Sequence, residues 1–392
     1  MAKGNINFLD KLTSAPHMAS KQNVSDVVSR SANRAELVKS TNREYNGSEV
    51  TGESQARTEL SNAASDNRAF ARWTCPDPSP NLTMVLSQTN LPEEPRFNAS
   101  KRYYVSEAIQ EHKYVQPADD EEQKRLNDQS QFIVHAFNNK LIWAPVNLKE
   151  DDMVPDSGTG SGDWLLSLAK ERDIDHKFPC IKLLGIDISP RMFPPPSLHP
   201  IKTTFSMESI TSLPHSWSNT VSLIHQRLLM LALQPSQWKV ALAEMYRVLV
   251  PGGWIQVFEG QRLFESPSDE IVYHKAFRLR DDLCLAVCNV AVDIVDYLPN
   301  WIEEAGFVNL NIVKRGLPMG ASWSEEWSAP GVQSIGAFWS ALKEPVMREG
   351  GLGIVKSGEE YDAVIEDLKR RCEEVPRTYW PMILFTAQKP LE

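Results

Sequence analysis

The feature that most constrains this chain is the glycine-rich segment DSGTGSG at residues 156–162. It follows a short apolar run at residues 153–156 and precedes residues 162–172, GDWLLSLAKER, which have the apolar spacing of a helix. Glycines let the backbone turn tightly and approach a ligand without a side-chain clash. The free N–H groups at the start of the next helix favour a carboxylate or a phosphate. The segment therefore predicts a strand–loop–helix unit that binds a ligand, although an ordinary strand–helix turn has the same pattern.

Apolar runs and helical patterns alternate after this segment. The runs CIKLLGIDI, TVSLIHQ and WIQVFEG, together with residues 202–206, are predicted as buried strands. PSQWKVALAEMYRVLVPGG is predicted as a helix that stops at Pro251-Gly252-Gly253, and TYWPMILFTAQKP as the last strand. Strands separated by helices of about 10–15 residues are typical of a mostly parallel sheet with helices on both faces. The predicted fold class is therefore α/β.

Composition divides the chain into two parts. Residues 1–100 are rich in Ser, Asn, Ala, Glu and Arg and end in a Pro-rich stretch, so we expect a disordered or weakly structured arm and linker. Residues 101–392 are expected to form the folded domain. Its amphipathic segment at 117–140 predicts an N-terminal cap helix. Residues 265–298 and 318–371 are predicted to be helical insertions.

The spacing of the glycines separates this loop from the dinucleotide-binding type. That type has the pattern G-x-G-x-x-G, whereas here the pattern is G-x-G-x-G with an acid two residues before the first glycine. Asp187 ends the next predicted strand, in LLGIDIS. A carboxylate at that position can accept two hydrogen bonds from the vicinal hydroxyls of a ribose. The alternative is an ordinary turn or helix-capping aspartate.

These residues resemble the class I S-adenosylmethionine-dependent methyltransferases, whose first motif reads acid-x-Gly-x-Gly-x-Gly. The chain is most similar to the LaeA-like group of fungal methyltransferases associated with secondary metabolism. The similarity lies in VPDSGTGSGDW, in GIDISP and in the run IHQRLLMLALQPSQWKVALAEMYRVLVPGGWIQVFEG. It covers roughly residues 103–316 and the last strand. It implies a Rossmann-like, seven-stranded, mostly parallel sheet with an antiparallel last strand and helical lid insertions.

The resemblance also assigns eight residues to the cofactor, S-adenosylmethionine. The acid and the glycines of the loop would hold its methionine end, the acid of the next strand its ribose, and the last three residues its adenine. Many relatives carry Asp-Ala where this chain has Met-Glu at the adenine position. The eight residues are Asp156, Gly158, Gly160, Gly162, Asp187, Ile188, Met207 and Glu208.

Candidate catalytic residues are few. His225 matches the residue that ends the fourth strand beside the methyl group, and histidine suits a base that works near neutral pH. We therefore predict His225 as a base or an acceptor-positioning residue, with a structural histidine as the alternative. Arg227 is interpreted as an anchor rather than a clamp for an acidic substrate, and His274 as a surface residue of the lid. Three tryptophans are candidates for either the acceptor pocket or ordinary packing, namely Trp323, Trp327 and Trp339.

The formal net charge of -10 argues against a general nucleic-acid-binding protein, because neutralising phosphates requires a basic surface. No apolar run approaches the roughly 20 residues that span a bilayer, so no membrane partner is expected. Cys284 and Cys288 lie one helical turn apart without further metal ligands at suitable spacing, so we expect helix packing and no metal site. The predicted location is the cytoplasm, with the nucleus as the alternative.

Three functions follow from this sequence. The first is transfer of a methyl group to an O, N or S atom of a small apolar metabolite, in fungal secondary metabolite biosynthesis. The second is a LaeA-like nuclear regulator, whose N-terminal arm binds a protein partner. The third is a cofactor-binding relative of the same fold that catalyses a reaction other than methylation. The fold alone does not choose among them.

Overall fold

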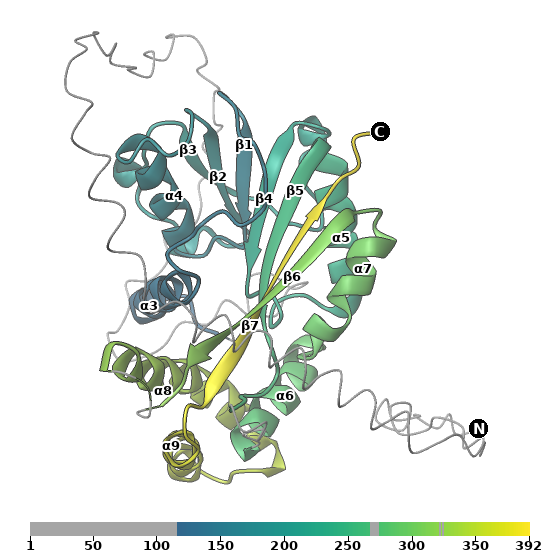
Figure 1. Cartoon of the computed structure of the whole chain (residues 1–392). Helices are drawn as coiled ribbons and strands as arrows, with labels where there is room; N and C mark the ends of the chain where they lie inside the picture. Colours follow the sequence, from purple (N-terminus) through teal and green to yellow (C-terminus); the bar gives the residue numbers. More distant parts are fainter. Residues whose placement is uncertain (1–115, 267–273, 321–322, 324) are drawn as a thin grey trace, which may run out of the picture. The chain divides into compact units, whose positions relative to one another are not determined.

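The computed structural model describes residues 116–266, 274–320, 323 and 325–392 of the chain (Figure 1). The predicted arm and linker at residues 1–100 lie outside the described residues. All described residues belong to one compact unit of the chain, Ser79–Glu392. No helix among them is long and apolar enough to cross a lipid bilayer.

The described residues form a seven-stranded sheet in the order β3-β2-β1-β4-β5-β7-β6. The first five strands in chain order pair in parallel, whereas β7 lies between β5 and β6 and is antiparallel to both. This arrangement confirms the predicted mostly parallel α/β sheet with an antiparallel last strand. The strands are β1 (Met153–Ser157), β2 (Lys182–Asp187), β3 (Thr203–Met207), β4 (Val221–Arg227), β5 (Leu249–Gly260), β6 (Val308–Pro318) and β7 (Tyr379–Gln388).

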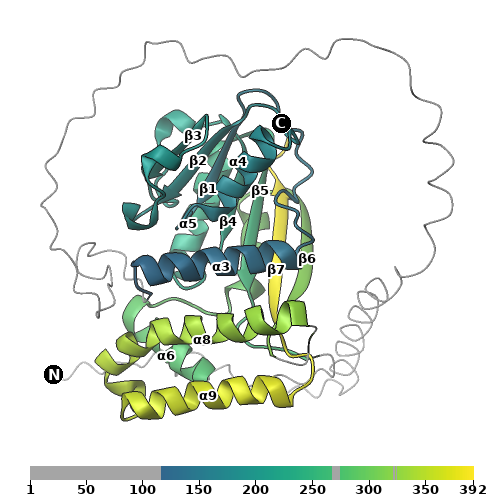
Figure 2. The ribbon, with the colours of Figure 1, turned by 90° about the vertical axis from the view of Figure 1, so that its left-hand side faces the viewer.

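Helices cover both faces of the sheet. The chain moves from β1 outward to β2 and from β4 in the opposite direction to β5, so right-handed crossovers place α4 and α5 on opposite faces. Figure 2 shows α3 and α4 in front of the sheet and α5 behind it. The helices that flank the sheet are α3 (Asp120–Ala136), α4 (Asp163–Asp173), α5 (Pro235–Val248) and α7 (Leu298–Glu304).

Three further helices pack on one another beneath the sheet (Figures 1 and 2). They are α6 (Lys275–Cys288), α8 (Glu325–Arg348) and α9 (Gly358–Glu374). Helices α6 and α8 lie in the segments predicted as helical insertions, and α9 extends slightly past the end of the second segment. Cys284 and Cys288 of α6 are buried in the apolar core, as the helix-packing interpretation predicted. Short 3-10 turns connect several elements, at Pro190–Met192, Pro196–Leu198, His215–Trp217, Ile294–Asp296 and Gly350–Gly353.

The predicted end of the helix before β5 was wrong. Helix α5 ends at Val248, and Pro251-Gly252-Gly253 lies inside β5 rather than in a loop. The register of β5 on β4 shifts between Val221 and Leu223, and the left-handed Gly252 (φ +80°) allows the local bend. The proline and glycines therefore form an irregular start to the strand instead of a separate turn.

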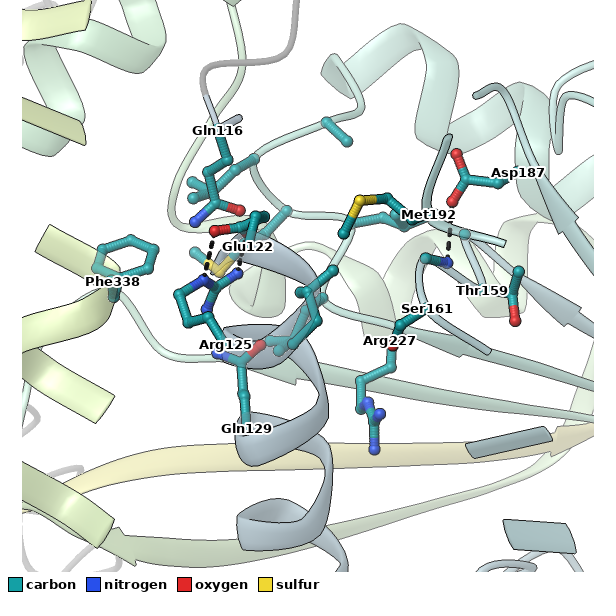
Figure 3. A pocket seen from close by; sticks show the side chains of 18 of the residues that line it. Gln116, Glu122, Arg125, Gln129, Thr159, Ser161, Asp187, Met192, Arg227 and Phe338 are labelled. Carbon is teal, nitrogen blue, oxygen red and sulfur yellow. Dashed lines mark hydrogen bonds and ion pairs between the residues drawn. The ribbon is translucent and has the colours of Figure 1, made fainter. Parts of the chain in front are cut away.

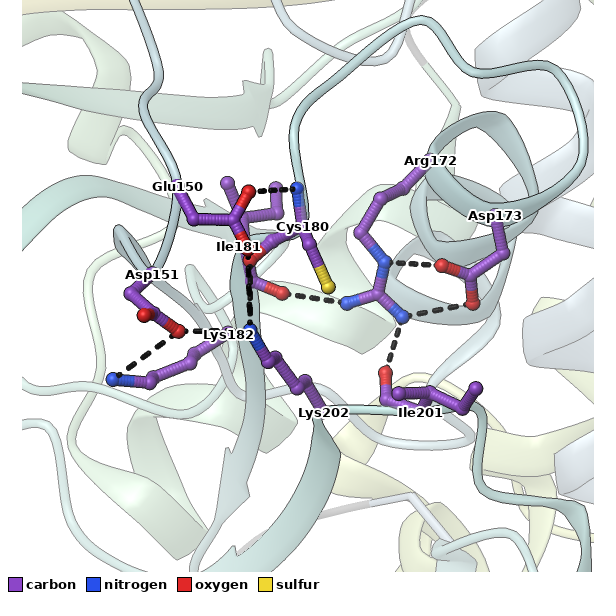
Figure 4. A network of polar contacts seen from close by, with 9 residues as sticks. All are labelled: Glu150, Asp151, Arg172, Asp173, Cys180, Ile181, Lys182, Ile201 and Lys202. Carbon is purple, nitrogen blue, oxygen red and sulfur yellow. Dashed lines mark hydrogen bonds and ion pairs between the residues drawn. The ribbon is translucent and has the colours of Figure 1, made fainter. Parts of the chain in front are cut away.

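The amino ends of β2 and β3 are joined to α4 by a buried arginine (Figure 4). Arg172 is 3% exposed and donates to the carbonyl of Ile181 at 2.6 Å and to the carbonyl of Ile201. It also forms a two-point ion pair with Asp173, through Nε at 2.6 Å and Nη2 at 2.9 Å. These contacts hold the end of the sheet that lies opposite the carboxyl ends of the parallel strands.

Candidate functional site

The glycine loop follows β1 at the carboxyl end of the sheet. Its backbone enters the left-handed region at Gly158 (φ +64°) and Gly160 (φ +51°), which only glycine adopts without strain. A Cβ atom at Gly158 would lie 2.6 Å from Cδ2 of Leu229, and one at Gly160 would lie 3.3 Å from Cδ1 of Leu126. The loop is therefore a glycine cradle, a tight backbone turn packed against Leu229 and Leu126 that a side chain at either glycine would disturb.

Asp187 joins this loop to the end of β2. Its Oδ2 accepts a hydrogen bond from the Gly160 backbone N–H at 3.1 Å, and its Oδ1 accepts one from the Ser189 N–H at 3.1 Å. Burial raises the pKa of the Asp187 carboxyl, and these backbone hydrogen bonds oppose the increase because they favour the charged form. The carboxylate thus stands at the carboxyl ends of two neighbouring strands, where open α/β sheets bind ligands.

Asp156 lies deeper, under the loop. Its Oδ2 accepts a hydrogen bond from the Thr159 hydroxyl at 2.6 Å, and the residue is only 4% exposed. Burial raises the pKa of Asp156 to about 7, against the hydrogen bond from Thr159 and the charge of Arg227. Arg227 itself donates from Nη2 to the Ser130 hydroxyl at 2.8 Å, which ties the end of β4 to α3. This contact agrees with the interpretation of Arg227 as an anchor.

A pocket of about 240 Å³ begins at this loop and continues beneath the sheet. We call its first part the loop half, because its walls are the segments that follow β1, β2, β3 and β4. We call the second part the helical half, because α3, α6 and α8 supply most of its walls. Figure 3 shows the two ends, with Thr159, Ser161 and Asp187 at one end and Gln116, Arg125 and Phe338 at the other.

The helical half is mainly aromatic. Phe277 of α6 and Trp339 of α8 are each 1% exposed, and their rings meet edge to face at 5.8 Å. Helix α3 adds a polar strip to this apolar wall. The aromatic wall residues are Phe264, Phe277, Phe338, Trp339 and Trp380, and the strip consists of Glu122, Arg125 and Gln129.

The segment after β4 lines the loop half and is held from behind by a buried carboxyl. Both oxygens of Glu259 accept backbone hydrogen bonds, from Leu229 at 2.8 Å and from Met230 at 3.2 Å. Glu259 is fully buried, and burial raises its pKa to about 8. Leu228, at the start of this segment, has a left-handed backbone (φ +57°). The carboxyl therefore fixes the wall that contacts the glycine loop through Leu229.

The structure brings together most of the residues assigned to the cofactor, but not all of them. Gly162 caps the start of α4 and does not line the pocket. Met207 is 64% exposed and also lies off the pocket wall. The assigned residues that line the pocket are Asp156, Gly158, Gly160, Asp187, Ile188 and Glu208.

The candidate base His225 does not line this pocket. The residue is 1% exposed, its ring stacks on Trp164 at 3.8 Å, and its Nδ1 lies 3.1 Å from Nε2 of Gln256. Burial lowers the pKa of His225 well below its ordinary value, because the charged form has lost its water. This position corresponds to the alternative interpretation, a structural histidine.

His274 and Trp323 make contacts that support the fold. His274 caps the start of α6 by accepting from the Ala276 N–H, and its Nε2 lies 2.7 Å from Oδ2 of Asp367 in α9. Of the three tryptophans, Trp339 lines the pocket, whereas Trp323 donates its indole N–H to the carbonyl of Thr378. The side chain of Trp327 lies outside the described residues.

Sequence reasoning missed the polar strip of α3 and the carboxyl of Glu259. A signal for the strip was present, because Glu122, Arg125 and Gln129 recur at the spacing of one helical face. Nothing in the sequence distinguishes Glu259 from an ordinary residue near a strand end.

A seven-stranded sheet of this order, with a glycine cradle after β1 and an acid at the end of β2, defines a Rossmann-like nucleoside-binding domain. Residues 154–253 match a family model described as a methyltransferase domain. The N-methyltransferase sirN of Leptosphaeria maculans is 38% identical over 214 residues, which cover 54% of this chain and 72% of that protein. The chain belongs to the S-adenosylmethionine-dependent methyltransferases, and S-adenosylmethionine is its cofactor.

Two other relatives match a larger share of this chain. The N-methyltransferase tcpN of Claviceps purpurea (strain 20.1) is 28% identical over 278 residues, covering 68% of this chain and 94% of that protein. The secondary metabolism regulator laeA of Gibberella zeae (strain ATCC MYA-4620 / CBS 123657 / FGSC 9075 / NRRL 31084 / PH-1) is 28% identical over 326 residues, covering 76% of this chain and 98% of that protein. Both expected kinds of relative are thus present, the enzymes and the regulators.

Proposed function

We propose that this methyltransferase transfers its methyl group to a nitrogen atom of a small apolar metabolite, in fungal secondary metabolism. The sequence alone left O, N and S open, and the names of the relatives sirN and tcpN favour nitrogen. The observation that carries the proposal is the continuity of the pocket, which runs from the glycine loop into a buried aromatic chamber. Such a chamber suits an apolar small molecule, because its walls offer mostly ring surface.

The cofactor fits the loop half of the pocket. The left-handed glycines Gly158 and Gly160 let the backbone turn tightly in the pocket wall, and this loop would take the methionine end beside Asp156. Asp187 would accept hydrogen bonds from the ribose hydroxyls, and Ile188 and Glu208 would flank the adenine. When bound, S-adenosylmethionine supplies a methyl carbon that its sulfonium has already activated.

The chain's own task is then mainly to orient the acceptor and to exclude water. In-line displacement needs the nucleophile about 3–3.5 Å from the methyl carbon in good alignment. The aromatic walls of the helical half hold an apolar molecule and displace its water, and the polar strip of α3 orients its polar groups. Glu259 contributes by fixing the segment after β4, whose Leu229 side chain lies against the glycine loop at Gly158.

The proposal is tested by transfer of a deuterated methyl group. The full-length chain is incubated with S-adenosylmethionine carrying a deuterated methyl and with a fungal metabolite extract, and products are identified by mass spectrometry. We expect a product in which one deuterated methyl replaces a hydrogen on nitrogen. The Asp187→Ala variant, which lacks the carboxylate proposed to bind the ribose, should give little product. A label found on oxygen, sulfur or carbon would contradict the assignment to nitrogen.

A second candidate function is that of a regulator, and one observation favours it. The similarity to laeA of Gibberella zeae extends over 98% of that protein. We propose the cytoplasm as the location of an enzyme, whereas a regulator would accumulate in the nucleus. A fluorescent fusion separates the two, and so does deletion of residues 1–95. An enzyme should keep its turnover after this deletion, while a regulator should lose its protein partners.

A further inference from the structure

The ring of Trp380 lies against a glycine of the neighbouring strand. Trp380 is the second residue of β7, and Gly260 is the last residue of β5, paired with Met382 two residues further along β7. A Cβ atom at Gly260 would lie 2.0 Å from Cζ2 and 2.5 Å from Cε2 of the indole. The indole N–H donates to the carbonyl of Gln261 at 2.7 Å, which fixes the ring in this place. The indole therefore fills the space that a side chain at Gly260 would need.

The indole separates Gly260 from the pocket. Trp380 is half-buried and lines the helical half, whereas Gly260 is buried and does not line it. Trp380 belongs to the sheet, while its fellow wall residues Phe277 and Trp339 belong to helices. The ring is thus the sheet's contribution to the aromatic wall, with a strand backbone directly behind it.

Trp380 stands well away from the glycine loop. Two strands, β4 and β5, lie between β1 and β7 in the sheet. Three strand spacings of about 4.8 Å place β7 roughly 14 Å from β1. The loop follows the carboxyl end of β1, and Trp380 lies beside the carboxyl end of β5, at the same edge of the sheet. The indole therefore bounds the pocket on a side remote from the proposed place of the cofactor.

We propose that Trp380 determines the size of the acceptor, by limiting how far the acceptor extends from the glycine loop toward β7. The inference rests on the proposed function, because it names the class of acceptor for the same site, a compact apolar ring system. The methionine end of the cofactor takes up part of the distance between the loop and the indole. A longer acceptor would meet the indole, which cannot move back because it already lies against the backbone of Gly260.

Two substitutions should move this limit in opposite directions. Trp380→Ala removes the indole and should lengthen the pocket. Gly260→Ala places a methyl group behind the indole, which must move 1.4 Å to turn the 2.0 Å approach into the 3.4 Å at which ordinary contact begins. The pocket is on the other side of the ring, so this variant should have a shorter pocket. In the double variant the new methyl group meets no indole, and the pocket should be as long as in Trp380→Ala.

Gly316→Ala is the matched control. Gly316 of β6 lies under the ring of Tyr379, and a Cβ atom there would be 2.7 Å from Cδ2 of that ring. Neither Gly316 nor Tyr379 lines the pocket. Neither Gly260 nor Gly316 has a left-handed backbone that alanine would strain. The control therefore makes the same substitution against a ring of β7, but away from the acceptor.

The test compares two neutral aromatic amides, naphthamide and the longer para-phenylbenzamide. Their binding to the full-length chain saturated with S-adenosylhomocysteine is measured by calorimetry, after binding of S-adenosylhomocysteine itself has shown that each variant is folded. The wild type and the control should bind naphthamide about tenfold more tightly, because the second ring of para-phenylbenzamide is not accommodated. Trp380→Ala and the double variant should prefer para-phenylbenzamide, and Gly260→Ala should bind both amides about tenfold more weakly than the control.

Tighter wild-type binding of para-phenylbenzamide, or no binding of naphthamide, would overturn the inference even if a variant failed to fold. So would a folded Trp380→Ala that keeps the wild-type preference, or a folded Gly260→Ala that binds both amides as the control does. A methyl label found on oxygen would contradict the proposed nitrogen acceptor and leave this size ranking unchanged. An unchanged ranking in the folded variants would leave the assignment to nitrogen standing, so the two failures are distinguishable.

Discussion

Replacement of Gly158 by alanine tests the glycine cradle most sharply. At φ +64° an alanine carries the left-handed penalty, roughly 1–2 kcal/mol. Its Cβ would also stand 2.6 Å from Cδ2 of Leu229, so the two groups must separate by 0.8 Å to reach the 3.4 Å at which ordinary contact begins. The Leu229 backbone is held by Glu259 and its side chain packs against the core, so part of this displacement falls on the glycine loop.

A matched control exists in the same chain. Gly353 has almost the same backbone, φ +68°, but a Cβ there meets nothing within 4 Å, and the residue is exposed and off the pocket wall. Gly353→Ala should therefore carry the backbone strain alone. Gly353→Ala should lose about 1–2 kcal/mol of unfolding free energy and Gly158→Ala should lose more, because of the added contact with Leu229; each kcal/mol lowers the melting temperature by about 2–4 °C.

Only Gly158→Ala should lose affinity for the cofactor. Displacing one backbone donor from a charged ligand costs about 1.5–3 kcal/mol, which is roughly tenfold or more in dissociation constant. Calorimetry with S-adenosylhomocysteine and thermal unfolding of the two variants give both quantities. The reasoning is refuted if both variants bind S-adenosylhomocysteine as the wild type does, or if Gly353→Ala loses as much affinity as Gly158→Ala.

Three other predictions concern buried polar residues. Because burial raises the pKa of Glu259 from 4.5 to about 8, the folded state keeps a proton that the unfolded state releases, and stability should fall as the pH rises through this window. Glu259→Gln should flatten that fall in urea unfolding between pH 4.5 and 8; an unchanged pH profile would be inconsistent with this carboxyl as its source. His225→Ala should lower the unfolding free energy by about 2–4 kcal/mol, through loss of its stack on Trp164, and leave turnover at saturating cofactor near wild type; a collapse of turnover in folded protein would restore His225 as a base. Arg172→Met should cost about 2–4 kcal/mol without changing cofactor affinity, and unaltered urea unfolding would show that its buried contacts contribute little.

Much of the sheet could be predicted because parallel strands buried on both faces appear as continuous apolar runs. The strands β1 to β5 and β7 lie within or close to the predicted segments. The end of α5 was misplaced because Pro251-Gly252-Gly253 usually terminates structure, whereas here a register shift accommodates it within β5. The sequence around these residues does not show that β4 will pair with them.

The candidate site, like the sheet, could be predicted from the sequence only in part. The glycine cradle and Asp187 could be predicted because their chemistry depends on residue type and on short spacing. His225 was placed beside the methyl group by analogy, but its side chain lies among Trp164 and Gln256, away from the pocket. The direction in which a residue at a strand end points depends on packing across the sheet. For the same reason the acceptor wall, assembled from α3, α6 and α8, has no compact sequence signature.

The central claim is that the glycine cradle and the Asp187 carboxylate together bind S-adenosylmethionine. Calorimetric titration of the full-length chain with S-adenosylhomocysteine, for wild type and for Asp187→Ala, tests it most directly. The account predicts one site per chain in the wild type and at least about tenfold weaker binding in the variant, since hydrogen bonds to a charged group are lost. No binding to the wild type, or equal binding to both proteins, would contradict it.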